Sequence, residues 1–123
     1  TDATAIRIGA PASWKKARAE VRFSAGTVLD VTDEEIAEAR AIVGRDGVGC
    51  EPASAASLAG LRKLVASGAV ARDADVVCVL TGHVLKDTAY AARYHASEAP
   101  HANAIVRGID LADYLNLVML TRA

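Results

Sequence analysis

The segment VVCVLTGHVLKD (residues 76–87) decides how the rest of the chain is interpreted. Its first five residues are apolar, and a continuous apolar run is typical of a strand buried on both faces of a parallel sheet. Thr81, Gly82 and His83 follow at once, and none of the three adds much to a core. Ligands of open parallel sheets bind beyond the carboxyl ends of the strands. A hydroxyl, a bare glycine and an imidazole at such an end therefore indicate a binding site.

The composition is that of a folded domain without a dominant charge. Of 123 residues, 52% are apolar, and 14 basic side chains balance 15 acidic ones to a net charge of -1. Such a chain can form one modest core, and it gives no electrostatic reason to expect nucleic acid or a membrane as partner. Cys50 and Cys78 form no CxxC pair, so we interpret them as reduced thiols of a cytoplasmic protein. His95 and His101 lack a third ligand, and we expect no metal site.

Strand-like and helical patterns alternate along the chain. Short β-rich or apolar runs predict strands at residues 4–9, 27–31, 48–51 and 75–82. Helices are expected after Ser13, after a capping box formed by Thr32 and Glu35, from Pro52, and from Val84 to His95. The alternation predicts the α/β class, with an open, mainly parallel sheet and flanking helices. Residues 97–103 are interpreted as a linker, residues 104–108 as an edge strand, and Asp110 as the cap of a last helix.

Three of the predicted strand ends carry residues that suit a site. Gly9 follows the first strand, Glu51 the third, and the pair Thr81 and Gly82 the fourth. Each also has a purely structural interpretation. Glu51 precedes Pro52 and would be favourable at a helix N-terminus, and the Thr81 hydroxyl could satisfy a loop amide. The pattern alone leaves both interpretations open.

Longer motifs make the chain recognisable. The segments ATAIRIGAPASWKKA (3–17), CEPASAASLAGLRKL (50–64) and VLTGHVLKD (79–87) closely resemble threonine synthases, in the same order and with plausible spacing. The segment VTDEEIAEAR (31–40) also looks like that family, and the resemblance covers about residues 3–88. It implies a pyridoxal-phosphate lyase of the tryptophan-synthase-β fold type, here the C-terminal portion of its large domain. Such enzymes convert O-phosphohomoserine and water to threonine and phosphate.

The resemblance also implies roles for individual residues. In the family, the threonine that matches Thr81 lies beside the pyridine nitrogen of the cofactor, where a hydroxyl can donate to a neutral ring. A carboxylate there would instead favour a protonated ring. Gly82 would let the backbone approach the ring without a Cβ in the way. Glu51 would lie near the ring or start a helix, and His83 is expected to cap the next helix without a chemical role.

At the N-terminal motif, the resemblance implies cofactor contacts at Ile8 and Gly9. Arg7 either binds a substrate phosphate or carboxylate, because arginine binds such groups bidentately, or it faces solvent. Two positions depart from the family pattern. Val84 stands where the family usually has the second glycine of TGHG, and Ala10 stands where many members have asparagine. Both put details of substrate binding in doubt, but not the family.

Two parts of the cofactor anchor are not found in this sequence. The family lysine that forms the Schiff base lies in a Ser-x-Phe-Lys-Asp-like context, and Lys15, Lys16, Lys63 and Lys86 all lie in other contexts. The segment GRDGVG (44–49) is more typical of a helix end than of a phosphate loop. We therefore expect the isolated chain to be inactive and without a catalytic residue of its own. Residues 1–96 would belong to the large catalytic domain, with 97–123 a linker and tail.

This interpretation predicts its partners: O-phosphohomoserine, the missing N-terminal part of the same enzyme, and, by resemblance only, a homodimer. Two alternatives remain open. The chain could belong to a relative of the same fold type with another reaction, such as a threonine or serine dehydratase or a cysteate synthase. It could also be a non-catalytic module, and an open sheet edge would then favour association with another chain.

Overall fold

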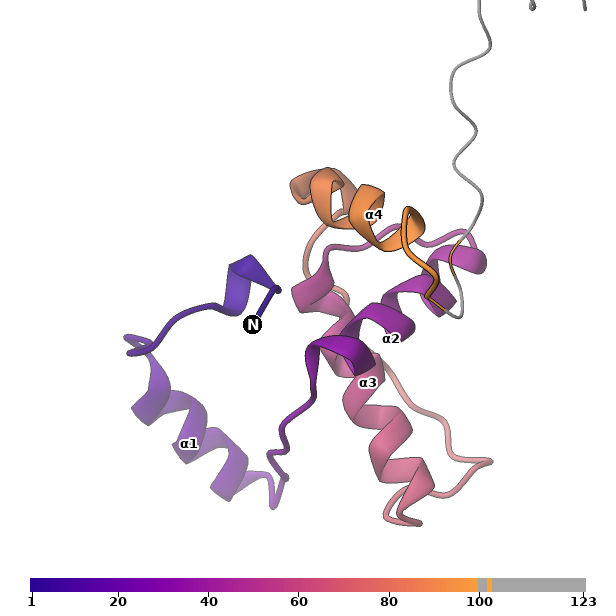
Figure 1. The fold of residues 1–123 in the computed structure, drawn as a ribbon. Coiled ribbons are helices and arrows are strands. Elements are labelled where there is room, and N and C mark those ends of the chain that lie inside the picture. The colour runs from indigo at the N-terminus through magenta and orange to yellow at the C-terminus, as the bar shows by residue number, and fades with distance from the viewer. Residues whose placement is uncertain (100–101, 103–123) are drawn as a thin grey trace, which may run out of the picture.

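The computed structural model describes residues 1–99 and residue 102, and its described part is helical (Figure 1). The predictions for residues 104–108 and Asp110 lie outside the described residues. The elements are η1 (Thr4–Ile6), α1 (Trp14–Phe23), α2 (Asp33–Arg45), α3 (Pro52–Ala66), η2 (Val84–Lys86) and α4 (Thr88–His95).

Local sequence signals explain where these helices begin. The predicted capping box of α2 is confirmed: Thr32 Oγ1 accepts the Glu35 amide at 3.2 Å, and Glu35 Oε2 accepts the Thr32 amide at 2.7 Å. Pro52 is the first residue of α3, as expected from its fixed φ. The single helix predicted over 84–95 is divided, because Asp87 accepts the Tyr90 amide and begins α4 separately from η2.

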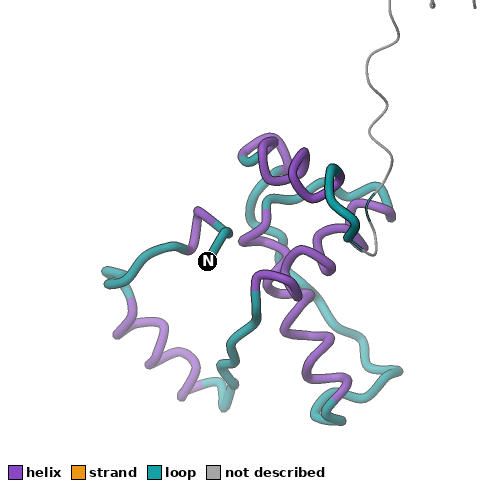
Figure 2. Tube along the Cα trace, viewed as in Figure 1, coloured by secondary structure: helices purple, strands orange, loops and turns teal. Residues whose placement is uncertain are grey.

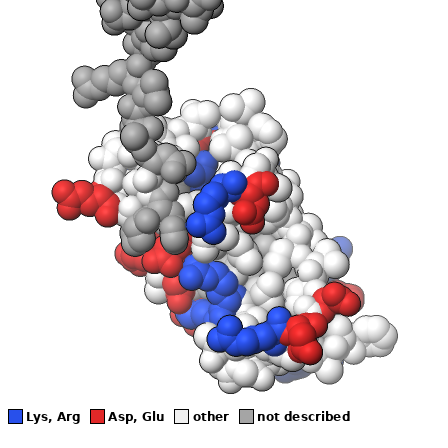
Figure 3. All heavy atoms as spheres, turned by 90° about the vertical axis from the view of Figure 1, so that its right-hand side faces the viewer, with Lys and Arg blue, Asp and Glu red and all other residues white. Residues whose placement is uncertain are grey.

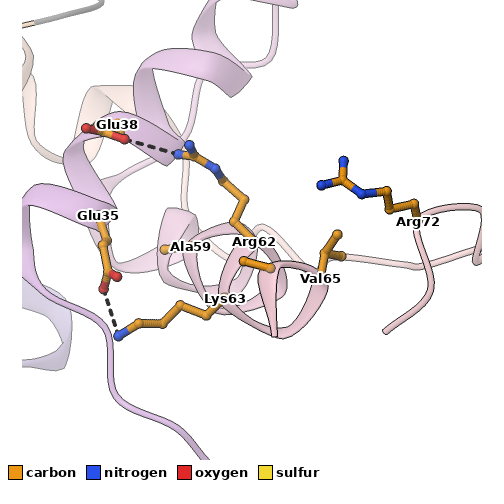
Figure 4. A pocket seen from close by; sticks show the side chains of 8 residues that line it. Glu35, Glu38, Ala59, Arg62, Lys63, Val65 and Arg72 are labelled. Carbon is orange, nitrogen blue, oxygen red and sulfur yellow. Dashed lines mark hydrogen bonds and ion pairs between the residues drawn. The ribbon is translucent and has the colours of Figure 1, made fainter. Parts of the chain in front are cut away.

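The core lies between α2 and α3, which cross closely in Figure 1. Ile36 and Ala39 of α2 pack with Ala55 and Ala59 of α3, and small side chains allow the two helices to approach. Ala3 and Cys50 complete this cluster. Ion pairs bridge the same two helices at the surface (Figure 4): Lys63 to Glu35 at 3.0 Å and Arg62 to Glu38 at 3.3 Å.

Residues 1–99 contain no β-strand, as Figure 2 shows, so the predicted strands are corrected here. The prediction for 4–9 is wrong because the Ile6 and Arg7 amides bond back to Ala3 and Thr4, closing a 3-10 turn. Residues 27–31 and 75–81 run as loops. A strand needs a second backbone at about 4.8 Å for its ladder, and these loops have none within the described part of the chain.

Helix α1 stands apart from the other helices (Figure 1). It has no buried residue, and the Phe23 side chain is 90% exposed. Acidic and basic side chains are interspersed on the face drawn in Figure 3, in keeping with the balanced composition. Among the described residues, none of the helices has the length and apolar character needed to cross a membrane.

Candidate functional site

A short pairing of two distant segments builds the candidate site. Gly49–Glu51, just before α3, runs antiparallel to Gly82–Val84 through a bridge between Cys50 and His83. The Glu51 amide donates to the Gly82 carbonyl at 3.0 Å, and the Val84 amide donates to the Gly49 carbonyl at 3.3 Å. We call these six residues, Thr81 and the first turn of α3 the loop junction. It brings Glu51 to the predicted motif at Thr81 and Gly82.

Ser54, in the first turn of α3, links the two sides of the loop junction. Its Oγ accepts the Gly82 amide at 2.7 Å and lies 3.2 Å from Thr81 Oγ1 and 3.4 Å from the Gly82 carbonyl oxygen. Ser54 is only 2% exposed, and Gly82 is buried, but Thr81 is exposed. The junction thus presents one threonine hydroxyl at the surface, held from behind by a buried serine.

The carboxylate of Glu51 lies against the bare side of Gly82. A Cβ at Gly82 would overlap the Glu51 side chain, so any larger residue would require Glu51 to move. Glu51 is the N-cap residue of α3, but its side chain forms no capping hydrogen bond. Instead Glu51 Oε1 lies 3.6 Å from Lys86 Nζ, and the carboxylate is largely buried while the lysine is exposed. Glu51 thus occupies the predicted position at the N-terminus of α3, but its side chain pairs with Lys86 and does not cap the helix.

Arg40 supports the junction from α2. It is buried, its Nε donates to the Cys50 carbonyl at 3.0 Å, and its guanidinium lies over the Tyr90 ring, 5.6 Å from the centroid. Burial raises the pKa of the Cys50 thiol, the Arg40 charge acts in the opposite direction, and Glu51 adds to the rise. Cys50 is thus a structural thiol whose carbonyl anchors the loop before α3.

The other predicted site residues lie elsewhere. Arg7 donates through Nε to the Thr1 carbonyl at 2.6 Å and lies 3.9 Å from Asp2, so it binds its own N-terminal segment. The Ile8 side chain is 60% exposed, and a Cβ at Gly9 would meet nothing within 4 Å. Within the described residues, no hydrogen bond or ion pair joins these three residues to the loop junction.

His83 behaves as expected, because its Nδ1 accepts the Leu85 amide at 3.2 Å and caps η2. Val84, which departs from the family pattern, packs against Gly49: a Cβ on Gly49 would lie 2.8 Å from Val84 Cγ1. The larger residue on one segment is thus matched by a glycine on the other.

Sequence reasoning missed Ser54, although a signal for it was present. Ser54 lies one turn before Leu58, which packs against the core. A serine on a face otherwise lined by alanine and leucine needs a hydrogen-bond partner when it is buried. No pattern in the sequence identified that partner, because Thr81 and Gly82 lie 27 and 28 residues further along the chain.

Known proteins resemble this chain in a consistent way. Residues 1–82 match the family described as "Pyridoxal-phosphate dependent enzyme". The chain is 58% identical to the threonine synthase of Methanosarcina acetivorans over 71% of its length, and 54% identical to that of Halalkalibacterium halodurans, also over 71%. It is 52% identical to the threonine synthase of Mycobacterium leprae over 81% of its length. These matches cover 22%, 25% and 28% of the three relatives.

The chain therefore belongs to the pyridoxal-phosphate dependent enzyme family. It spans about a quarter of the length of the curated relatives it matches. The recognition of threonine synthases in its motifs is confirmed by these relatives.

The loop junction fits one side of a pyridoxal phosphate ring. It offers the exposed Thr81 hydroxyl, while the bare side of Gly82 is occupied by the Glu51 side chain. Of the four lysines, Lys63 pairs with Glu35, Lys86 pairs with Glu51, and Lys15 lies over the Trp14 ring.

Proposed function

We propose that this chain is part of a threonine synthase that makes threonine and phosphate from O-phosphohomoserine and water. One observation carries the proposal: a chain at least 50% identical to several threonine synthases brings Glu51, Thr81 and Gly82 together at one junction. Pyridoxal phosphate, when bound, supplies an electron sink for carbanion chemistry. The Thr81 hydroxyl would hydrogen-bond to its pyridine nitrogen, and Gly82 makes room for the Glu51 side chain next to it.

The remainder of the enzyme would supply the Schiff-base lysine and the phosphate loop. The limited share of the relatives that the chain covers supports this division. In that setting, residues 75–82 would join an open, mainly parallel sheet, residues 1–96 would belong to the large domain, and 97–123 would form a linker and tail. Ile8, Gly9 and Arg7 would reach cofactor or substrate only once such a sheet has formed. We propose a cytoplasmic homodimer for the whole enzyme.

Phosphate release from O-phosphohomoserine by the whole enzyme tests the reaction. We expect one threonine for each phosphate released, and a loss of about two- to tenfold in kcat/KM for Thr81→Val, because a hydrogen bond to a neutral group contributes about 0.5–1.5 kcal/mol. Activity on free serine or threonine alone would instead indicate a dehydratase. The 123-residue chain by itself should show no borohydride-sensitive absorption band when pyridoxal phosphate is added, and a specific band would contradict the assignment of the lysine to another segment.

A further inference from the structure

We infer that Ser54 is a positioning residue for the cofactor contact: its hydroxyl donates to Thr81 Oγ1 and so directs the Thr81 proton outward, to the pyridine nitrogen. The inference rests on the proposed function. It assigns a task to a buried side chain of the loop junction that lies behind Thr81 and cannot itself reach a ligand, since it is only 2% exposed.

The first step concerns the proton of Ser54. The Ser54 oxygen already accepts the Gly82 amide at 2.7 Å, so its own proton is left to donate. Two acceptors are within reach, Thr81 Oγ1 at 3.2 Å and the Gly82 carbonyl at 3.4 Å. The carbonyl is the poorer choice, because it is further away and already accepts the Glu51 amide at 3.0 Å.

The second step concerns the proton of Thr81. A hydroxyl has one proton and two lone pairs, so a Thr81 oxygen that accepts from Ser54 keeps its proton for another partner. Thr81 is exposed, while Ser54 and Gly82 behind it are buried, so that partner must lie on the open side. The chain of donors therefore runs from the Gly82 amide through Ser54 to Thr81 and outward. Each hydrogen bond in such a chain polarises the next one and strengthens the last donor.

The third step concerns selectivity for a neutral ring. Thr81 would be fixed as a donor, and a donor hydroxyl pairs with an unprotonated nitrogen but not with a protonated one. Were Ser54 absent, the Thr81 hydroxyl could rotate and accept a hydrogen bond as readily as donate one. Ser54 would thus determine which protonation state of the ring the site prefers, without contacting the ring.

The test uses the whole enzyme loaded with 15N-labelled pyridoxal phosphate, and reads the chemical shift of the pyridine nitrogen and its dependence on pH. Ser54→Ala, Thr81→Val and the double variant are compared with the parent. Ser57→Ala is the matched control, because the Ser57 hydroxyl, one turn later on α3, donates only to the Ser54 carbonyl of its own helix. Ser54→Cys keeps the shape with a weaker donor, and it provides a second reading if the alanine variant does not fold.

We expect Ser54→Ala to move the nitrogen shift in the same direction as Thr81→Val, to add nothing in the Thr81→Val background, and to lower kcat about fivefold with little change in KM. The nitrogen shift of Ser54→Cys should lie between those of Ser54→Ala and the parent, and the shift of Ser57→Ala should match that of the parent. A nitrogen shift unchanged by Ser54→Ala, or changed equally in the Thr81→Val background, overturns the inference while leaving the proposed function intact. If Thr81→Val leaves the shift unchanged, the cofactor contact itself is wrong, and the role of Ser54 is refuted with it.

Discussion

At Gly82, the backbone passes so close to Glu51 that the absence of a side chain becomes a structural requirement. We expect Gly82→Ala to destabilise the chain by about 1–3 kcal/mol, because the added methyl group overlaps the Glu51 side chain and the residue is buried. Gly44→Ala is the matched control, since a Cβ there meets nothing within 4 Å and Gly44 lies within α2. It should be neutral or gain up to about 1 kcal/mol. Urea unfolding followed by circular dichroism measures both, and equal stability of the two variants would contradict the close approach at Gly82.

At the scale of the helix, the start of α2 is held by side chains and the start of α1 is not. Thr32→Ala should cost about 0.5–2 kcal/mol, because it removes the acceptor for the Glu35 amide. Ser13→Ala should change stability little, since Ser13 is the N-cap residue of α1 but forms no side-chain capping bond. The same unfolding measurement applies. An equal loss of unfolding free energy in both variants would mean that the side-chain hydrogen bonds of the capping box do not stabilise α2.

The capping box also makes stability depend on pH. The Thr32 amide and then Lys63 lower the pKa of Glu35 from its ordinary value of 4.5. A carboxyl whose pKa is lower in the folded state stabilises the fold above its unfolded pKa, and this contribution is lost as the pH falls through the folded pKa. We therefore expect the thermal midpoint to fall as the pH decreases from about 5 to about 3.

Glu35→Gln should weaken that pH dependence. Glu34→Gln, which alters the neighbouring acid outside the capping box, should leave it unchanged apart from the shared loss of charge. A pH dependence that persists in full in Glu35→Gln would assign it to other groups, of which Asp33 is the first to examine. Its pKa is lowered by the Thr1 hydroxyl and the Asp2 amide.

At the scale of the whole molecule, residues 76–80 leave apolar surface uncovered. Val77 is 90% exposed and Val79 is 68% exposed, while Leu80 packs on the core. A valine-rich segment with open backbone groups tends to pair with another chain. We expect the 123-residue chain to self-associate as its concentration rises, and Val77→Lys to reduce this association. Sedimentation velocity over about a tenfold range of concentration measures it.

Ala71→Lys is the control for that experiment, because it makes the same change of charge in the exposed turn before the valines. Equal effects of the two lysines would indicate charge repulsion rather than loss of an apolar contact. A parent chain that remains monomeric throughout would contradict the expectation that this surface seeks a partner.

The sequence by itself determined where α2 and α3 begin, and that His83 caps the helical turn that follows it. Their signals act within about four residues, as with Thr32 and Glu35, so they hold whatever surrounds them. The family could also be recognised from the order of its motifs. Of the three predicted strand ends, Glu51 and Gly82 lie side by side, whereas Gly9 lies elsewhere. The predicted cofactor contacts of Ile8 and Gly9 stay predictions, because they depend on a sheet that residues 1–99 do not form.

Only the tertiary structure decided that the apolar runs within residues 1–99 remain loops and what lies behind the predicted motif. Residues 75–81 have the composition of a buried strand, but a ladder requires a second backbone, and composition cannot supply one. Ser54 became part of the site because two segments far apart in sequence met at Gly82. Local signals fix where a helix begins, because the groups that satisfy its first turn are adjacent in the chain. Strand pairing and a buried hydroxyl depend on groups that only the folded chain brings together.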